Sequence, residues 1–178
     1  MKGLIVYKGK YGATMQYGIW LGAALHCPVA KSDFVRPEQI TQADYLLIGT
    51  SVYIGQLQIK QWLQVNLPLL EGKRIIFFVI AGGIPDKPGE VRSYYEKCVP
   101  ASLRETATCF YLPGRLNYGL LSLKDKLLLR IGAWFAARKG QKIGLADYNH
   151  VQREHLAPVI EAARLLEATY SDPQKTAL

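Results

Sequence analysis

The chain has 178 residues, of which 49 % are apolar and 20 % are charged, a composition that predicts one globular domain and excludes a disordered chain. The formal net charge of +8 favours anionic partners, although it is also compatible with a role in solubility alone. The three cysteines are an odd number spread along the chain and the three histidines lack metal-ligand spacing, so the sequence predicts neither a disulfide framework nor a metal site.

Five β-rich segments follow one another along the chain and alternate with helical patterns. Four are nearly continuous apolar runs, which is typical of strands buried on both faces of a parallel sheet. These runs cover residues 3–7, 45–51, 74–82 and 107–112, and a weaker segment over 28–34 fits the sheet edge. Helical patterns cover residues 13–25, about 56–66, about 88–98 and about 148–169. The alternation predicts a single α/β domain over residues 1–178, with right-handed crossovers.

Three of the predicted strands end in loops rich in glycine or hydroxyl groups. The loops read KGKYGAT after the first strand, GTSVYIG after the run at 45–51 and AGGIPDKPG after the run at 74–82. Ligands of open parallel sheets bind just beyond the carboxyl ends of the strands. Glycines also close ordinary turns, but three such loops at one edge favour a ligand site there.

The segment 113–142 is the most basic part of the chain, with seven Lys or Arg residues against the single acid Asp125. On a helix, its apolar residues share one face; they are Leu123, Leu127, Leu128, Ile131, Trp134 and Phe135. One interpretation is a helix that packs on its own domain with a solvated charged face. The other is a surface that meets anionic lipid or an anionic substrate.

Taken together, these motifs resemble the flavodoxin fold, and most closely the flavodoxin-like group of menaquinone-dependent protoporphyrinogen oxidases. The resemblance covers nearly the whole chain. It rests on YKGKYGAT, on LLIGTSVYIGQLQIKQWL, on LPGRLNYGLLSLKDKLLLRIGAWFAARKG and on the final helix after ADYNHVQ. It implies a doubly wound five-stranded parallel sheet of order 2-1-3-4-5 with a basic helical insert at about 113–142 before the last helix, a non-covalent FMN, and electron transfer.

The first loop is the part of the chain that the resemblance assigns to the FMN phosphate. In flavodoxins it reads Thr/Ser-x-Thr-Gly-x-Thr, and its hydroxyl and N–H groups surround the phosphate at a helix N-terminus. This chain keeps a glycine and the last hydroxyl but has Gly9 and Tyr11 where the pattern has hydroxyl residues. The predicted phosphate residues are Gly9, Lys10, Tyr11, Gly12, Ala13 and Thr14. Lys8 and Lys10 add positive charge that we expect to ease reduction of the flavin.

The two other loops are expected to border the flavin ring. The residues assigned to them are Thr50, Ser51, Val52 and Tyr53, and then Ala81, Gly82 and Gly83. Thr50 and Ser51 carry hydroxyls for the phosphate or ribityl chain, and Tyr53 can cover a ring face. Tyr53 can equally be an ordinary half-buried tyrosine, and the glycines can serve the turn alone.

The leading functional hypothesis is an FMN-dependent oxidoreductase that passes electrons from a reduced tetrapyrrole to a quinone. Arg115, Lys124, Lys126 and Arg130 are candidates for contact with substrate or membrane, and no catalytic acid or base is identified. The alternatives are a flavodoxin-type electron carrier that serves a redox partner protein, and a binding module without flavin. No nucleic acid is expected as a partner.

The sequence also carries an expectation about location. It has no apolar stretch of about 18 residues, and its first strand begins too early for a signal peptide. We therefore expect a cytoplasmic protein, with peripheral attachment to anionic lipid at the inner face of the membrane as an open alternative.

Overall fold

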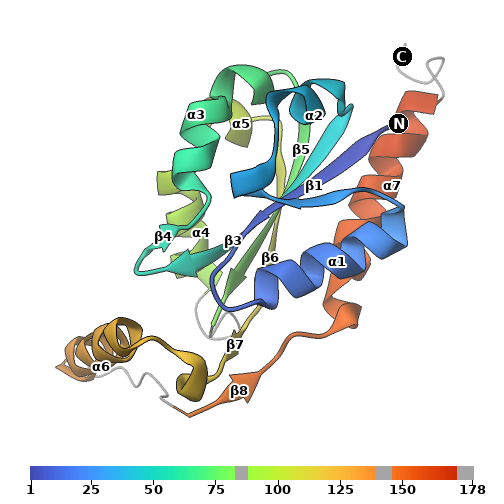
Figure 1. Ribbon diagram of the computed structural model, residues 1–178. Coiled ribbons are helices and arrows are strands. Elements are labelled where there is room, and N and C mark those ends of the chain that lie inside the picture. Colours follow the sequence, from blue (N-terminus) through green and yellow to red (C-terminus); the bar gives the residue numbers. More distant parts are fainter. Residues whose placement is uncertain (83–87, 139–145, 172–178) are drawn as a thin grey trace.

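The computed structural model describes residues 1–82, 88–138 and 146–171 of the chain, and its centre is a parallel sheet (Figure 1). Five strands run in the order β2-β1-β3-β5-β6, which confirms the predicted order when they are numbered one to five along the chain. Their bounds are β1 Gly3–Lys8, β2 Val29–Lys31, β3 Tyr45–Tyr53, β5 Arg74–Ala81 and β6 Thr108–Pro113.

Helices cover both faces of the sheet and bury two apolar clusters against it (Figure 1). On one face lie α1 Ala13–Leu25 and α7 Ala157–Ser171. On the other lie α2 Pro37–Gln42, α3 Lys60–Leu70, α4 Pro88–Cys98 and α5 Ala101–Arg104. This two-sided coverage explains why the strand sequences are apolar at consecutive positions rather than at alternate ones.

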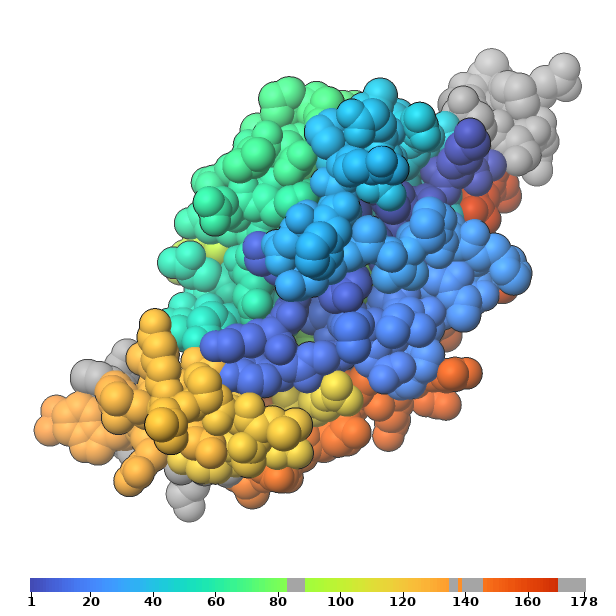
Figure 2. Space-filling model, viewed as in Figure 1, coloured from blue at the N-terminus to red at the C-terminus, as the bar shows by residue number. Residues whose placement is uncertain are grey.

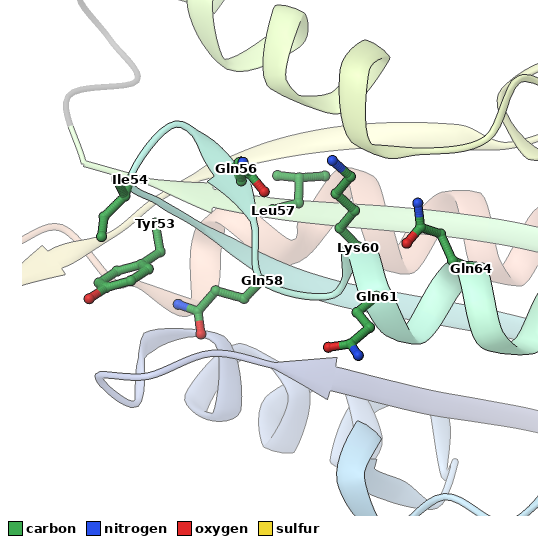
Figure 3. Close-up of a pocket in the computed structure, with 8 residues that line it drawn as sticks. All are labelled: Tyr53, Ile54, Gln56, Leu57, Gln58, Lys60, Gln61 and Gln64. Atoms are coloured by element: carbon green, nitrogen blue, oxygen red, sulfur yellow. The ribbon is translucent and has the colours of Figure 1, made fainter.

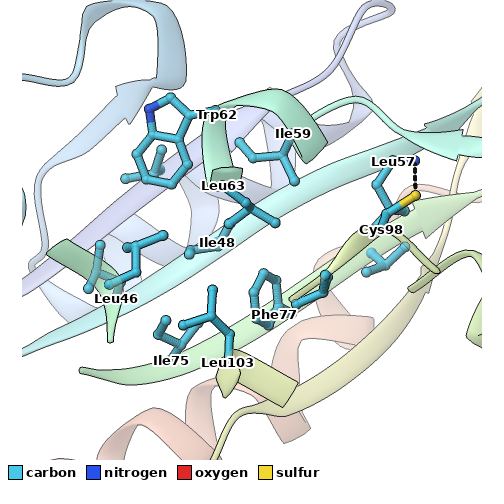
Figure 4. Packing of buried hydrophobic residues seen from close by; sticks show 14 of the residues in the cluster. Leu46, Ile48, Leu57, Ile59, Trp62, Leu63, Ile75, Phe77, Cys98 and Leu103 are labelled. Carbon is cyan, nitrogen blue, oxygen red and sulfur yellow. Dashed lines mark hydrogen bonds between the residues drawn. The ribbon is translucent and has the colours of Figure 1, made fainter. Parts of the chain in front are cut away.

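Strand β5 illustrates the two-sided burial. Phe77 belongs to the cluster under α3 and α4, whereas its neighbour Phe78 belongs to the cluster under α1 and α7. Figure 4 shows Phe77 packed among Ile48 and Leu103 in the first cluster. Burial of each such phenylalanine contributes about 1.5–3 kcal/mol to the free energy of folding. The clusters therefore make the sheet a rigid base for the loops at its edge.

Three elements differ from the sequence prediction. Helix α3 begins at Lys60 instead of about residue 56, because Ile54 and Gly55 adopt positive φ and turn the chain into β4 Gln56–Leu57, which pairs antiparallel with β3. The edge strand β2 covers only Val29–Lys31 and is followed by the 3-10 turn η1 Ser32–Phe34. The last helix, α7, begins at Ala157 rather than at residue 148.

The residues before α7 belong instead to the base of the insert. There β8 Tyr148–Asn149 pairs antiparallel with β7 Arg115–Leu116, and the 3-10 turn η4 Arg153–Leu156 leads into the helix. Between β7 and β8 the chain forms the 3-10 turn η3 Tyr118–Leu120 and helix α6 Leu123–Arg138. The predicted basic helical insert is therefore present, and Figure 2 shows it, in yellow and orange, as a lobe beside the blue first loop.

Candidate functional site

Strands β1, β3 and β5 bring the three predicted loops to one edge of the sheet. Lys8 at the end of β1 is in register with Thr50 of β3, and Ser51 is in register with Ile80 of β5. The chain therefore leaves the sheet at neighbouring positions in three successive strands. Of the residues expected in the third loop, Ala81 and Gly82 lie at this edge, and Gly83 lies outside the described residues.

The N-terminus of α1 points its free backbone N–H groups into this edge. Gly12 caps the helix in the left-handed conformation, with φ of 82°, and α1 has no side-chain cap. The first intrahelical bond runs from the Gln16 N–H to the Gly12 carbonyl, at 3.0 Å. The N–H groups of Ala13, Thr14 and Met15 precede this bond, so they have no acceptor within the helix, and no side chain caps them. Such a helix end, with its positive dipole, is suited to an anion.

The hydroxyls of Thr14 and Ser51 border this helix end, whereas the hydroxyl of Thr50 is bonded to the turn before α3. A Cβ placed on Gly9 would lie 2.3 Å from Thr14 Oγ1 and 3.4 Å from Ser51 Oγ, so only glycine lets the backbone pass between them. Ser51 Oγ accepts a hydrogen bond from Gln58 at 3.0 Å. Thr50 is fully buried and accepts a hydrogen bond from the Ile59 N–H at 3.2 Å, so its hydroxyl supports the turn before α3.

A buried carboxylate from α6 joins the first loop to the end of β3, a contact that sequence reasoning missed. Asp125 is 5 % exposed and accepts hydrogen bonds from the Lys10 ammonium at 2.6 Å and from the hydroxyls of Tyr11 and Tyr53. The hydrogen bond to Asp125 raises the pKa of Lys10, and the bond with Tyr53 adds to this effect. We call Lys10, Tyr11, Tyr53 and Asp125 the Asp125 cluster.

The two lysines of the first loop are thus both paired with carboxylates. Lys10 Nζ lies on Asp125, and Lys8 Nζ lies 2.9 Å from Asp33 Oδ1. Asp33 also pairs with Lys31, at 2.9 Å, so the two carboxylates offset only part of the positive charge around the first loop. The expectation that these lysines ease flavin reduction stays a prediction.

Arg115 of β7 is the basic residue that lies against the α1 N-terminus. Its Nε and Nη2 donate to the Tyr11 carbonyl at 3.4 and 3.3 Å. A Cβ on Gly12 would lie 2.5 Å from Arg115 Nη2, so the absence of a side chain at Gly12 makes room for the guanidinium. Arg115 is half-buried, and no carboxylate of the described residues is within ion-pair distance of it.

The three basic residues predicted on α6 lie apart from this group. Lys124 and Arg130 are exposed, and the Lys126 ammonium lies 5.5 Å from the centre of the Tyr118 ring. Four apolar side chains of α6 are also exposed, by 85, 60, 43 and 51 %: Leu123, Leu127, Ile131 and Trp134. The side chain of Phe135 lies outside the described residues. In the described ranges, no helix has both the length and the apolarity to cross a bilayer.

Two cavities flank the Asp125 cluster. One, of about 380 Å³, lies between Tyr53, strand β4 and the start of α3, where Gln58, Lys60 and Gln61 line it (Figure 3). The other, of about 540 Å³, lies between the first loop and the base of the insert. Its lining residues include Tyr11, Arg115, Leu116, Leu120 and Tyr148. No group of acidic, Cys or His residues in the described part of the chain is arranged to hold a metal ion.

Comparisons with known proteins agree with this architecture. A model of the flavodoxin domain family matches residues 4–142. Flavodoxin 2 from Bacillus cereus, in its oxidised form, superposes with a TM-score of 0.50 at 16 % identity, covering 64 % of this chain and 84 % of that one. A flavoprotein in complex with FMN from Lactobacillus acidophilus gives 0.43 at 16 % identity, covering 63 % and 91 %. No curated protein matches the sequence significantly.

Proposed function

Because the chain belongs to the flavodoxin domain family, we propose that it binds FMN at the carboxyl edge of its sheet and works as an oxidoreductase. The observation that carries this proposal is the uncapped N-terminus of α1, whose free N–H groups open at the edge where three strands end. FMN, when bound, supplies the redox chemistry, and the protein supplies binding, orientation and electrostatics.

The residues at this edge fit the phosphate of FMN. The backbone of residues 9–14 offers N–H donors without needing side chains, and the buried hydroxyl of Thr14 lies at the same helix end. Gly9 and Gly12 let the loop backbone lie close to Thr14 and Arg115, because a Cβ at either position would come too near to one of these side chains. Two hydroxyls of the usual flavodoxin pattern are thus replaced by glycine and by Tyr11, whose own hydroxyl is bound to Asp125.

The other two loops are proposed to hold the flavin ring. Ser51, Val52 and Tyr53 border it on the β3 side, and Ala81 and Gly82 border it on the β5 side. Tyr53 is fixed by its hydrogen bond to Asp125, so its ring has a defined position from which to exclude water.

The test of FMN binding is reconstitution. The purified protein, incubated with excess FMN and then passed through a desalting column, should retain the visible absorbance of oxidised flavin in proportion to protein. A colourless protein that also fails to quench FMN fluorescence would contradict the proposal. It would favour the binding module without flavin.

We further propose that the electrons come from a reduced tetrapyrrole, which loses electrons and protons in pairs until it is a porphyrin, and that each electron pair, with two protons, turns one quinone into a quinol. The support is the insert, where an exposed apolar face lies on the same helix as Lys124, Lys126 and Arg130. Such helices lie in the membrane interface, and anionic lipid attracts their basic residues. The same charges suit the carboxylates of a tetrapyrrole.

An anaerobic assay separates this activity from that of an electron carrier. The reconstituted protein should convert a porphyrinogen to the fluorescent porphyrin only when a quinone is added. A carrier would instead be reduced by a reductase and would leave the porphyrinogen unchanged.

Vesicle sedimentation tests the membrane contact separately. Binding to phosphatidylserine vesicles should fall with salt. It should also fall in the triple variant Lys124→Glu, Lys126→Glu, Arg130→Glu. A matched control places the same change of charge at exposed positions on other elements: Arg74→Glu, Lys97→Glu and Arg164→Glu. Equal loss in both triple variants would indicate attraction by net charge, and no binding at low salt would contradict the membrane contact.

A further inference from the structure

We propose that Arg115 is a phosphate-binding residue, so that the insert completes the FMN site and the cofactor in turn fastens the insert. This inference rests on the proposed binding of FMN and adds to it a residue from outside the first loop. It assigns to the base of the insert a role in affinity that is independent of lipid or substrate.

The position of Arg115 suits a phosphate ligand. The Arg115 guanidinium lies against the residue that caps α1, with Nη2 only 2.5 Å from where a Gly12 Cβ would be. Its two hydrogen bonds to the Tyr11 carbonyl, at 3.3 and 3.4 Å, are long and use only part of the five-donor fork. The remaining donors are available to an anion held by the same helix end.

The charges around the α1 N-terminus also favour an anion beside Arg115. A cation beside the positive end of a helix dipole is repelled by it, and α1 has no acidic residue in its first turn to offset this repulsion. No Asp or Glu side chain in the described part of the chain lies within ion-pair distance of Arg115. By contrast, Lys8 and Lys10 each have one. An anion between the guanidinium and the helix end turns the repulsion into two favourable interactions, and a phosphate matches the planar fork of arginine.

The backbone around Arg115 is held from both sides. It pairs with Asn149 in the β7–β8 ribbon. The preceding residue, Gly114, donates its N–H to the Ala81 carbonyl at 3.0 Å and accepts from the His150 N–H at 3.1 Å. The base of the insert is therefore tied to the end of β5. Binding of a phosphate by Arg115 then couples the order of this ribbon to the occupancy of the site, and the coupling is reciprocal.

The decisive experiment compares FMN with riboflavin, which has the same ring but no phosphate. Dissociation constants for both are measured by quenching of flavin fluorescence in the wild type, in Arg115→Gln and in Arg164→Gln. The last variant is a control that removes one exposed guanidinium from α7. Arg115→Gln should weaken FMN binding by about ten- to a hundredfold and change riboflavin binding less than about twofold, because only the charged hydrogen bonds are lost. Arg115→Lys should recover part of the affinity, since it restores charge without the fork.

A second measurement uses the wild type alone, so that it does not depend on how well the variants fold. FMN should slow hydrogen exchange of the Leu116 and Tyr148 amides more than riboflavin does, and inorganic phosphate should compete with FMN. Equal protection by the two flavins would overturn the inference. So would an Arg115→Gln variant that binds FMN like Arg164→Gln, or one that loses both flavins equally. In these outcomes FMN binding itself stands. A wild type that binds neither flavin refutes the proposed function and the inference with it.

Discussion

Replacing Asp125 by alanine is expected to release the start of α6 from the first loop while leaving the sheet intact. The Asp125 carboxylate is the shared acceptor of the Asp125 cluster, and it joins the insert to Tyr11 and Tyr53. Its own N–H donates to Ser122 Oγ at 3.2 Å, so the substitution leaves the cap of α6 in place. The change therefore tests the contact between the insert and the domain rather than the helix itself.

The magnitude follows from the two phenol hydroxyls. A hydrogen bond to a charged acceptor contributes about 1.5–3 kcal/mol, and the half-buried phenols of Tyr11 and Tyr53 recover part of this from water when the carboxylate is gone. We take about 1 kcal/mol for each and assign nothing to Lys10, whose side chain is 40 % exposed. The sum of about 2 kcal/mol corresponds to a roughly 30-fold shift in the equilibrium between docked and undocked insert.

Hydrogen exchange of individual amides measures this equilibrium. Undocking leaves α6 as an isolated helix, which is only marginally stable in water, so its first turn then opens. The Lys126 amide, bonded to the Ser122 carbonyl at 2.9 Å, should therefore exchange up to about 30-fold faster in Asp125→Ala, while β5 amides keep their rates. Asp125→Asn, which keeps one acceptor oxygen, should lie between. Asp33→Ala is the control, because it removes the carboxylate that pairs with Lys8, the other lysine of the first loop. If the Lys126 amide exchanges no faster in Asp125→Ala than in Asp33→Ala, the cluster does not hold the insert.

Three further predictions concern the first loop and its surroundings. Gly12→Ala should lower the free energy of unfolding in urea by more than Gly72→Ala does. Both glycines have positive φ, which costs alanine about 1–2 kcal/mol. Only at Gly12 must the Arg115 guanidinium also move aside for the new Cβ and give up its hydrogen bonds to the Tyr11 carbonyl. Thr14→Ala should weaken FMN binding by about 1 kcal/mol, roughly fivefold in a fluorescence titration. Thr14→Ser, which keeps the hydroxyl, should bind FMN nearly as well as the wild type does. Hydrogen bonds from Lys31 and Lys8 lower the pKa of Asp33 to about 2. The wild type should therefore be more stable than Asp33→Asn above about pH 4, and it should lose this advantage as the pH falls towards 2. Equal stability of the two proteins at pH 5 would contradict the pairing.

The sheet could be predicted from the sequence because its signal is local. Each strand is a nearly continuous apolar run. Neighbouring residues such as Phe77 and Phe78 face opposite helix layers, so apolar residues at consecutive positions indicate burial on both faces. The helix starts were less accessible. The start of α3 depends on a positive φ at Ile54, and a β-branched residue rarely adopts this conformation. The start of α7 depends on the pairing of β8 with β7, which lies more than 30 residues earlier in the chain.

The first loop was predicted as a site, but the partners of its side chains were not. Lys10 reads as a phosphate ligand in sequence, whereas in the structure it lies on Asp125, 115 residues further along the chain. A signal was present, since Asp125 is the one acid in a strongly basic segment, but nothing local indicates what it contacts. Arg115 was predicted as a contact residue for substrate or membrane, and only the path of β7 brings it to Gly12.

The β7–β8 ribbon has a consequence for how this chain can be modified. The chain leaves the central fold at Gly114 and returns at His150, and these two residues are joined by a backbone hydrogen bond of 3.1 Å. A segment whose two ends meet can be shortened, exchanged or removed without stretching the remaining backbone. The insert can therefore be removed without disturbing the central flavodoxin-like fold. A chain with residues 115–149 replaced by a tight turn should keep its sheet while losing Arg115, Asp125 and α6 together.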